Sequence, residues 1–387
     1  IILLWFIPSQ GQTVALSAEE IVSIALENNA QLKATALKTE ESKTRVGSAF
    51  NFDKTSVYYH FDENNIAINN EPLKVFGIAQ DFRFPTVYFS DKKVKTANYN
   101  VNQSYYQIKV EALKHDVFLA CSQLSYAKNK AKAYQYLDSL YQQFAKASRR
   151  RFELGETNYL EMISAKSKQK LLETTYKQAL QEVLLAQEQL SKLVQKDSIT
   201  IADNPLEKLE LNTITLEDHI GLSLYENTNL YYKALNQKEK QNLLPDITAE
   251  YFQGSNSTLN TSLKGYQLGL KIPILFFGNA SKIKASKRAL ESAEAEEADY
   301  KIRLQSKYKV LLSTLKQHEE ALSYYEEQGR QLAKEILKTA ERTFKEGDID
   351  FFQYIQSIET ATSIELTYLE NLNSYNQTII AINYLIL

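Results

Sequence analysis

Hydrophobic residues recur along two long stretches of the chain with the alternating four- and three-residue spacing of packed α-helices. Proline, which breaks helices, is absent from 86–204 and from 274–387. The two sets predict very long helices with coiled-coil packing. The first set is Leu113, Val117, Ala120, Leu124, Ala127, Ala131 and Tyr134, and the second is Leu311, Leu315, His318, Leu322, Tyr325, Gly329, Leu332 and Ile336.

Shorter stretches alternate apolar and polar residues with the period of two that is typical of strands. In 266–272 the apolar side chains fall on one face, and Gln267, Gly269 and Lys271 fall on the other. Segments 55–61 and 76–84 alternate in the same way, with Asp81 and Arg83 on the polar side. We predict two β-hairpins, 55–62 with 75–86 and 246–254 with 266–275. Such strands are typical of a transmembrane β-barrel, and a small soluble sheet covered by helices is the alternative.

The two halves of the chain carry the same motifs in the same order, which indicates an internal duplication. Glu19, Leu26, Asn29 and Leu32 correspond to Glu217, Leu224, Asn227 and Leu230, and 82–85 and 152–161 correspond to 270–273 and 344–353. We predict a first repeat over 12–195, a connector over 196–214 and a second repeat over 215–387. Each repeat is expected to contain a helix, a hairpin, a very long helix, a tight turn and a second long helix. The expected helices are 17–48, 90–153 and 158–195, then 215–242, 279–345 and 350–385.

Four strands cannot close a barrel in a membrane, because open sheet edges in lipid leave backbone groups without hydrogen bonds. Two copies would give eight strands, whose interior is filled by side chains. Three copies would give twelve strands and room for a water-filled pore. The expected fold class is therefore an α+β membrane protein, a homotrimer with a twelve-stranded barrel and long coiled-coil helices.

Composition and charge narrow the class of protein. Hydrophobic residues make up 44% of the chain and charged residues 24%, and the net charge of −2 argues against a nucleic-acid binder. The single Cys121 lies in a helical pattern and is expected to be a small buried residue. Residues 1–11 are apolar and end in small residues, so we interpret them as the remnant of a signal peptide or, alternatively, as the end of a hydrophobic membrane segment.

No pattern in the sequence indicates catalysis or a bound metal or cofactor. The four histidines, His60, His115, His219 and His318, are scattered and have no neighbouring metal-ligand pattern. No phosphate-binding loop, dinucleotide fingerprint or nucleophile elbow is found. We therefore expect no enzyme, no catalytic residues, no metal site and no cofactor.

Two Phe-x-x-Gly segments predict the tight turns between the long helices. Gly155 and Gly347 are expected to end the first helix of each pair in a left-handed conformation. Asn158 and Asp350 are then N-caps, and Glu161 and Gln353 would complete a capping box in both repeats. The basic run 149–151 precedes the first turn, where it either complements the helix dipole or binds an acidic partner surface.

These features together resemble the TolC-like family of outer-membrane efflux channels. The resemblance covers about 15–387 and depends on the duplicated unit, Pro85 and Pro273 at strand ends, Leu244-Pro245 before a strand, and the two Phe-x-x-Gly turns. It implies a homotrimer in outer-membrane lipid with a helical tunnel in the periplasm. It also implies two partners, a periplasmic adaptor (membrane fusion) protein and an inner-membrane RND-type pump. The first repeat departs from the pattern, because Phe52-Asp53-Lys54 replaces Leu244-Pro245-Asp246.

The resemblance and the strand pattern supply candidate functional residues. The candidate gate is Glu161, with the neutral Gln353 in the second repeat, and the candidate barrel-lumen residues are Asp81, Arg83 and Lys271. The candidate adaptor-docking residues at the turns are Phe152, Gly155, Asn158, Phe344, Gly347 and Asp350.

Segment 80–88 resembles channels of heavy-metal exporters, so heavy-metal cations are one predicted cargo, and drugs or secreted proteins are the alternatives. A periplasmic coiled-coil scaffold protein is the competing function.

Overall fold

The computed structural model describes residues 16–64, 72–196, 199–212, 215–255, 262–275 and 277–385. The interpretation of residues 1–11 lies outside these ranges. The chain divides into two compact units. One is formed by 34–108 and 217–303 and is called the strand unit here. The other is formed by the N-terminal residues to 33, 109–216 and 304–387 and is called the helical unit.

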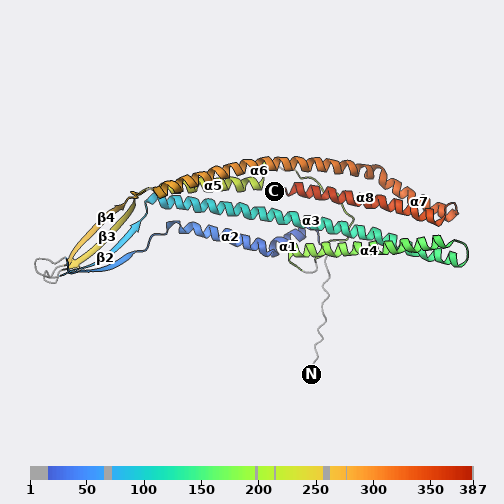
Figure 1. The fold of residues 1–387 in the computed structure, drawn as a ribbon, viewed down its shortest axis with the longest axis horizontal. Coiled ribbons are helices and arrows are strands. Elements are labelled where there is room, and N and C mark those ends of the chain that lie inside the picture. Colours follow the sequence, from blue (N-terminus) through green and yellow to red (C-terminus); the bar gives the residue numbers. More distant parts are fainter. Residues whose placement is uncertain are drawn as a thin grey trace, which may run out of the picture. The chain divides into compact units, whose positions relative to one another are not determined.

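The strand unit contains one antiparallel four-stranded sheet in the order β1–β2–β3–β4 (Figure 1). The strands are β1 (Ser56–Asp62), β2 (Leu73–Phe82), β3 (Asp246–Ser255) and β4 (Ser262–Lys271). The register places Asp81 opposite Thr248 and Thr248 opposite Gly269. The two predicted hairpins are therefore confirmed, and pairing of β2 with β3 joins them into one sheet.

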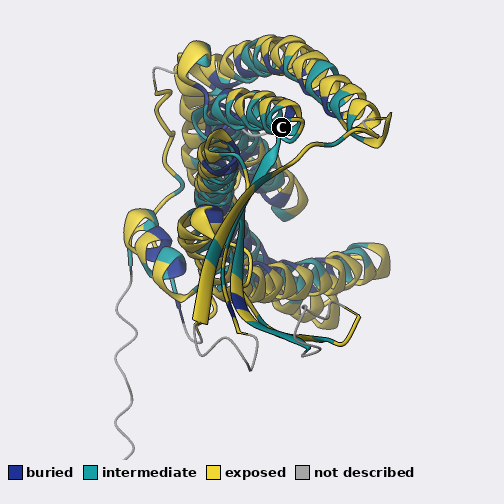
Figure 2. Cartoon of the chain, turned by 90° about the vertical axis from the view of Figure 1, so that its left-hand side faces the viewer, coloured by how far each residue is buried: buried dark blue, intermediate teal, exposed yellow. Residues whose placement is uncertain are grey.

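The two faces of the sheet differ in chemistry as the alternation predicts. One face carries mainly apolar side chains, and many of them are exposed: Tyr266 is 84% and Leu268 is 75% exposed. Figure 2 shows exposed residues along the strands. The described helices of the strand unit leave these side chains exposed. The other exposed apolar side chains of this face are Val57, Tyr59, Phe61, Phe76, Ile78, Tyr251 and Leu270.

Proline decides where the strands of the two hairpins end. The predicted strand 75–86 is wrong at its end, because β2 stops at Phe82 and α3 (Pro85–Glu153) begins at Pro85. Proline has no N–H for a sheet hydrogen bond, and its fixed φ suits the first helical position. β4 likewise ends at Lys271, two residues before Pro273, rather than at 275. The other helical elements of the strand unit are most of α2 (Ala30–Gly47), the 3₁₀ turns Ser48–Phe50 and Leu216–Asp218, α5 (Ile220–Gln241) and the first part of α6 (Phe277–Tyr324).

The predicted helix 17–48 is broken at Asn29. α1 (Ala18–Asn28) ends there because Asn29 adopts an extended conformation. The Asn29 side chain accepts a hydrogen bond from the Leu32 N–H at 2.9 Å and donates one to the Leu193 carbonyl at 3.2 Å. Gln195 accepts from the Ala30 N–H at 2.9 Å. These bonds cap the two helices and attach the break to the end of α4 (Tyr159–Val194). The corresponding Asn227 lies inside an unbroken α5.

In the helical unit, α3 and α4 form one hairpin (Figure 1). The apolar positions predicted for α3 lie on the buried side of this helix. Leu137, Tyr141 and Phe144 continue that side toward the turn, where they form a core cluster with Ile355 and Ile358. The buried members of the predicted set are Leu113, Val117, Ala120, Leu124, Ala127 and Ala131.

The second hairpin contains α6, a π-helical turn (Tyr325–Gly329), α7 (Arg330–Glu346) and α8 (Phe351–Asn383). The prediction for Leu332 is wrong, because it is 44% exposed whereas Ala340 is buried and Leu337 packs against the core. A π-turn inserts one extra residue into the helix and rotates the face that follows. The insertion moves the inward positions after Gly329 by one residue.

Part of the segment predicted as a connector, residues 207–212, runs along α8. The buried Asn376 side chain accepts from the Leu209 N–H at 2.9 Å and donates to the Glu207 carbonyl at 2.7 Å. Two turns later, Asn383 makes the same pair of bonds with Asn212 and the Glu210 carbonyl. A side-chain amide can pair with an extended backbone in this way because it carries both a donor and an acceptor. Two asparagines of α8 thus hold residues 207–212 through their backbone.

Candidate functional site

Both turns between the long helices have the same backbone geometry. Gly155 and Gly347 have φ angles of 76° and 81°. The Gly155 N–H donates to the Phe152 carbonyl at 3.0 Å, and the next N–H donates to the Arg151 carbonyl at 2.8 Å. The Gly347 turn repeats this pair at 3.2 and 2.9 Å. This is the Schellman motif. The left-handed glycines predicted from the sequence are confirmed.

The caps after the two turns differ, which corrects the prediction of two identical capping boxes. Asp350 and Gln353 form a complete box, with bonds of 2.8 and 3.1 Å. Asn158 accepts from the Glu161 N–H at 2.8 Å, but the Glu161 side chain bonds the Thr157 hydroxyl and lies 3.4 Å from Arg151. The equivalent of Arg151 in the second repeat is Thr343. Thr157 corresponds to Ile349, so the second turn lacks both of the side chains that hold the Glu161 carboxylate away from the cap.

The first turn is rich in exposed apolar side chains that the sequence analysis did not single out. Leu154 is 63% and Leu160 is 72% exposed, and Tyr159 packs edge-on against Phe152 at 5.8 Å. Leu154 and Leu160 lie outside the coiled-coil spacing of the long helices. In the sequence, that position was the signal that they are exposed. Exposed apolar residues on a rigid turn are suited to contact with another protein.

The second turn buries more of its aromatic surface. Phe344 stacks on Tyr354 with a centroid distance of 4.6 Å, and Phe351 stacks on Phe144 at 4.1 Å. Phe352 remains 57% exposed. The predicted docking residues Phe152 and Phe344 are thus not equivalent, because Phe152 is 38% exposed and Phe344 is partly buried.

On the polar face of the sheet, the structure brings two of the three predicted lumen residues together. Lys271 on β4 lies 2.6 Å from Asp81 on β2 and reaches across β3, and both side chains are about half exposed. Arg83 follows the end of β2, so strand alternation does not fix the side on which it lies. The same face carries Glu250, which accepts a hydrogen bond from Tyr58. Glu250 was not among the predicted lumen residues, and the alternation of polar and apolar residues in 246–254 was the signal for it.

Aromatic rings on this face lie over glycines of the next strand. A Cβ atom at Gly77 would lie 2.3 Å from the Tyr58 ring, and one at Gly265 would lie 2.4 Å from the Phe252 ring. The glycines therefore leave room for aromatic rings to lie flat across the sheet. The polar face combines flat rings with carboxylate, amide and ammonium groups, which suits contact with water.

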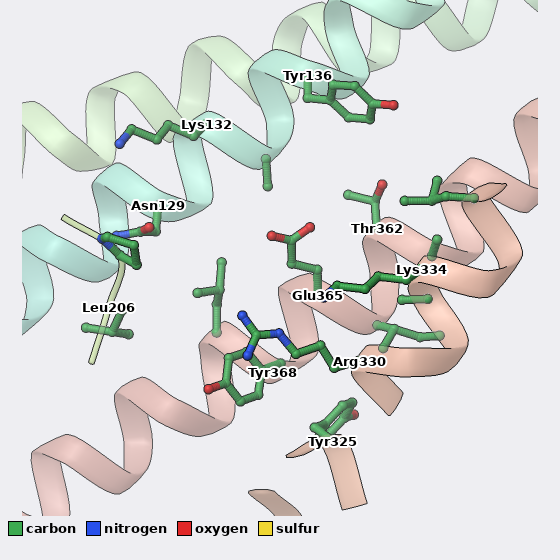
Figure 3. Close-up of a pocket in the computed structure, with 17 residues that line it drawn as sticks. Asn129, Lys132, Tyr136, Leu206, Tyr325, Arg330, Lys334, Thr362, Glu365 and Tyr368 are labelled. Carbon is green, nitrogen blue, oxygen red and sulfur yellow. The ribbon is translucent and has the colours of Figure 1, made fainter. Parts of the chain in front are cut away.

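The helical unit contains a cavity of about 540 Å³ beside the π-turn (Figure 3). Lys132 on α3, and Arg330 and Lys334 on α7, contribute positive charge, and the Glu365 carboxylate points into the cavity. Asp203 neutralises Lys132 at 2.8 Å. None of the residues that line this cavity is a predicted site residue. The cavity is therefore separate from the turns and from the polar face of the sheet.

The described part of the chain contains no group of three or more His, Cys, Asp or Glu side chains that could hold a metal ion. None of its helices combines the length and the apolar composition that a membrane crossing requires.

Solved structures with the same fold as this chain are known. No family model and no curated protein sequence matches the chain. Among solved structures, the Campylobacter jejuni CmeC outer membrane channel matches with a TM-score of 0.78 and 13% identity, over 95% of this chain and 84% of that one. The open-state Neisseria gonorrhoeae MtrE outer membrane channel matches with a TM-score of 0.73 and 16% identity, over 95% and 88%. The chain has the fold of outer-membrane efflux channels.

A further match is a membrane protein from Pseudomonas aeruginosa, with a TM-score of 0.79 and 13% identity over 96% of this chain and 92% of that one. The resemblance to TolC-like channels that the sequence indicated is thus confirmed in the fold. At these identities the agreement concerns the course of the backbone. It extends over nearly the whole of each chain, so both the sheet and the helical hairpins belong to the shared fold.

Proposed function

We propose that the protein is the outer-membrane exit channel of a tripartite efflux system. It would act as a passive duct, while an inner-membrane RND-type pump supplies the energy. The observation that carries the proposal is the four-stranded sheet, whose apolar face is exposed and whose polar face carries the Asp81–Lys271 pair. An apolar face toward lipid and a polar face toward water is the arrangement of a membrane barrel.

The two outer strands of the sheet, β1 and β4, each pair on one side only within the described chain. Edges of this kind would leave backbone groups unsatisfied in lipid. Three copies joined edge to edge would form a closed barrel of twelve strands with room for water, above a helical tunnel in the periplasm. The proposed assembly is therefore a homotrimer in outer-membrane lipid.

The turns at Gly155 and Gly347 are the proposed docking sites for a periplasmic adaptor protein. Both turns are fixed by Schellman bonds and N-caps, so a partner would meet a rigid surface. Exposed Leu154 and Leu160 supply apolar contact area on the first turn. Glu161, held by Arg151, is the proposed gate residue, and a ring of three such carboxylates would attract cations.

Heavy-metal cations are the proposed cargo, on the strength of the resemblance in segment 80–88. A wide wet pore selects by size and charge, so the channel itself needs no metal ligands. Metal specificity would then lie in the pump and the adaptor. Growth of a deletion strain on copper, zinc, cobalt and cadmium salts, compared with growth on detergents, bile salts and dyes, tests this assignment. Unchanged metal tolerance with new detergent sensitivity would replace metals by drugs as the cargo.

Membrane fractionation followed by single-channel recording in planar bilayers tests the proposed function. A channel is expected in the outer-membrane fraction and produces discrete conductance steps. Recovery of water-soluble, poreless trimers would instead support the periplasmic coiled-coil scaffold.

A further inference from the structure

The strand unit shows how one hairpin meets the next within the chain. Residues just after β2 form the exit of the first hairpin, and residues just before β3 form the entry of the second. The Thr86 hydroxyl at the exit donates a hydrogen bond to Gln241 Oε1 at the entry, at 2.5 Å. One turn further on, Asp91 pairs with Lys238. Val87 at this exit is only 2% exposed. At the exit of the first hairpin, Val87 is therefore buried by its own chain, and Thr86 is exposed but hydrogen-bonded.

The duplication assigns equivalents to these residues in the second hairpin. Alignment of Pro85 with Pro273 makes Ile274 and Leu275 the equivalents of Thr86 and Val87. Ile274 is 80% and Leu275 is 84% exposed. The second exit thus has an apolar residue in place of the polar Thr86, and an exposed residue in place of the buried Val87.

The entry of the first hairpin is also apolar and exposed. Phe50 and Phe52, just before β1, are 40% and 53% exposed. They wall a cavity of about 300 Å³, in which Phe52 contacts Phe82 and Tyr88 with centroid distances of 5.8 and 5.2 Å. Alignment of Phe52 with Leu244 makes the buried Ala49 the equivalent of Gln241. The hydrogen-bonding pair of the internal junction is therefore replaced by apolar residues at both positions.

We propose that Ile274 and Leu275 of one chain pack against Phe50 and Phe52 of a second copy. β4 ends and β1 begins at the same end of the sheet, so antiparallel pairing of β4 with the second copy's β1 brings these segments together. The contact repeats between chains the junction that Thr86 and Gln241 form within one. The contact is head-to-tail, because it joins the exit segment of one chain to the entry segment of the next. The ring closes when the exit segment of the last chain meets the entry segment of the first chain. This inference rests on the proposed trimeric channel and identifies the contact that closes it.

A pair of cysteines tests the contact in the full chain. Phe52→Cys and Ile274→Cys are combined in a Cys121→Ala background, and the membrane-extracted protein is oxidised. Within one chain the two positions lie beyond opposite edges of the sheet, about 14 Å apart at the ordinary strand spacing. A disulfide needs Cβ atoms about 4 Å apart. Any bond between these cysteines is therefore intermolecular. The matched control is Thr86→Cys with Gln241→Cys, which the internal junction brings together in one chain.

We expect the first pair to give disulfide-linked dimers and trimers. The control pair is expected to give monomers with a disulfide inside one chain. Phe52→Cys or Ile274→Cys alone is expected to give no trimer band. Trimers seen by light scattering without cross-linking by the first pair would overturn the proposed contact and leave the channel in place. In that outcome lipid covers the exit segment. Poreless particles that do not enter the membrane would overturn the channel as well, so the two failures are distinguishable.

Discussion

The carboxylate of Glu161 lies 3.4 Å from the guanidinium of Arg151, ten residues earlier on the other side of the first turn. Gln353, at the equivalent place in the second turn, instead bonds its own N-cap, Asp350. The two turns share a backbone but differ in charge. Only the first combines a carboxylate with a neighbouring guanidinium, so the two repeats are not interchangeable at the proposed gate.

Glu161→Gln is expected to weaken block of the channel by cations, because it removes the proposed ring of negative charge. Single-channel recording with added divalent cations measures the effect. Gln353→Glu is the matched variant, and it is expected to strengthen block, since it adds a carboxylate where Thr343 offers no counter-charge. Unchanged block in Glu161→Gln would exclude a gating role.

Gly155→Ala and Gly347→Ala are each expected to destabilise their turn by about 1–2 kcal/mol, the cost of a left-handed conformation with a Cβ atom. No atom lies within 4 Å of the added Cβ at either position, so the cost comes from backbone conformation alone. Hydrogen exchange of the turn amides measures the loss. Gly278→Ala, with equally open space and no positive φ, is the control. Equal protection in all three variants would contradict the argument.

Leu268→Lys is expected to prevent or slow insertion into the outer membrane. Leu268 lies on the apolar face of β4, and a lysine facing the middle of a bilayer costs about 2–4 kcal/mol. The neighbouring Gln267→Lys places the same charge on the polar face and is expected to insert normally. The amounts of heat-resistant oligomer in outer-membrane fractions compare the two. Equal insertion of both variants would argue against lipid contact at this face.

Cys121 is expected to resist thiol reagents in the native protein. Burial, with a smaller contribution from Glu19, raises the pKa of its thiol to about 12, so almost no reactive thiolate forms near pH 8. Maleimide labelling followed by mass spectrometry should give modification only after denaturation. A cysteine placed at exposed Leu154 should be labelled at once. Rapid native labelling of Cys121 would contradict its burial in α3.

Asp91→Asn is expected to destabilise the strand unit at neutral pH and to matter less in acid. Burial of the Asp91 carboxyl opposes ionisation, but Lys238 and Lys95 outweigh it and lower its pKa. A carboxyl with a lowered folded pKa adds stability above its unfolded pKa, about 3.9, and loses it as the pH falls through the folded value.

Thermal unfolding between pH 7 and pH 3 measures the difference between the wild-type chain and Asp91→Asn. The difference should shrink below about pH 4. Lys238→Met removes one of the two lysine partners and should reduce the pH dependence, while Lys95 still pairs with Asp91. A difference that is constant over this range would show that the ion pair contributes nothing.

The sequence by itself determined the features that depend on neighbouring residues along the chain. The period of two in 266–272 was enough to predict a strand and its two faces, because successive side chains of a strand point to opposite sides. Gly155 and Gly347 predicted the turns, since only glycine adopts the left-handed conformation without cost. The buried positions of α3 followed from spacing alone.

Tertiary structure decided the features that depend on residues far apart in the chain. The break at Asn29 needs the Leu193 carbonyl, and the Asp81–Lys271 pair needs β2 and β4 on either side of β3. The same residue type at Asn227 leaves its helix unbroken. The hydrogen-bond partner of a side chain depends on which residues pack against it. The pattern of neighbouring residues in the sequence does not predict those contacts. The capping box expected at Glu161 was wrong because the carboxylate contacts Thr157 and Arg151 instead of the N–H of its own cap.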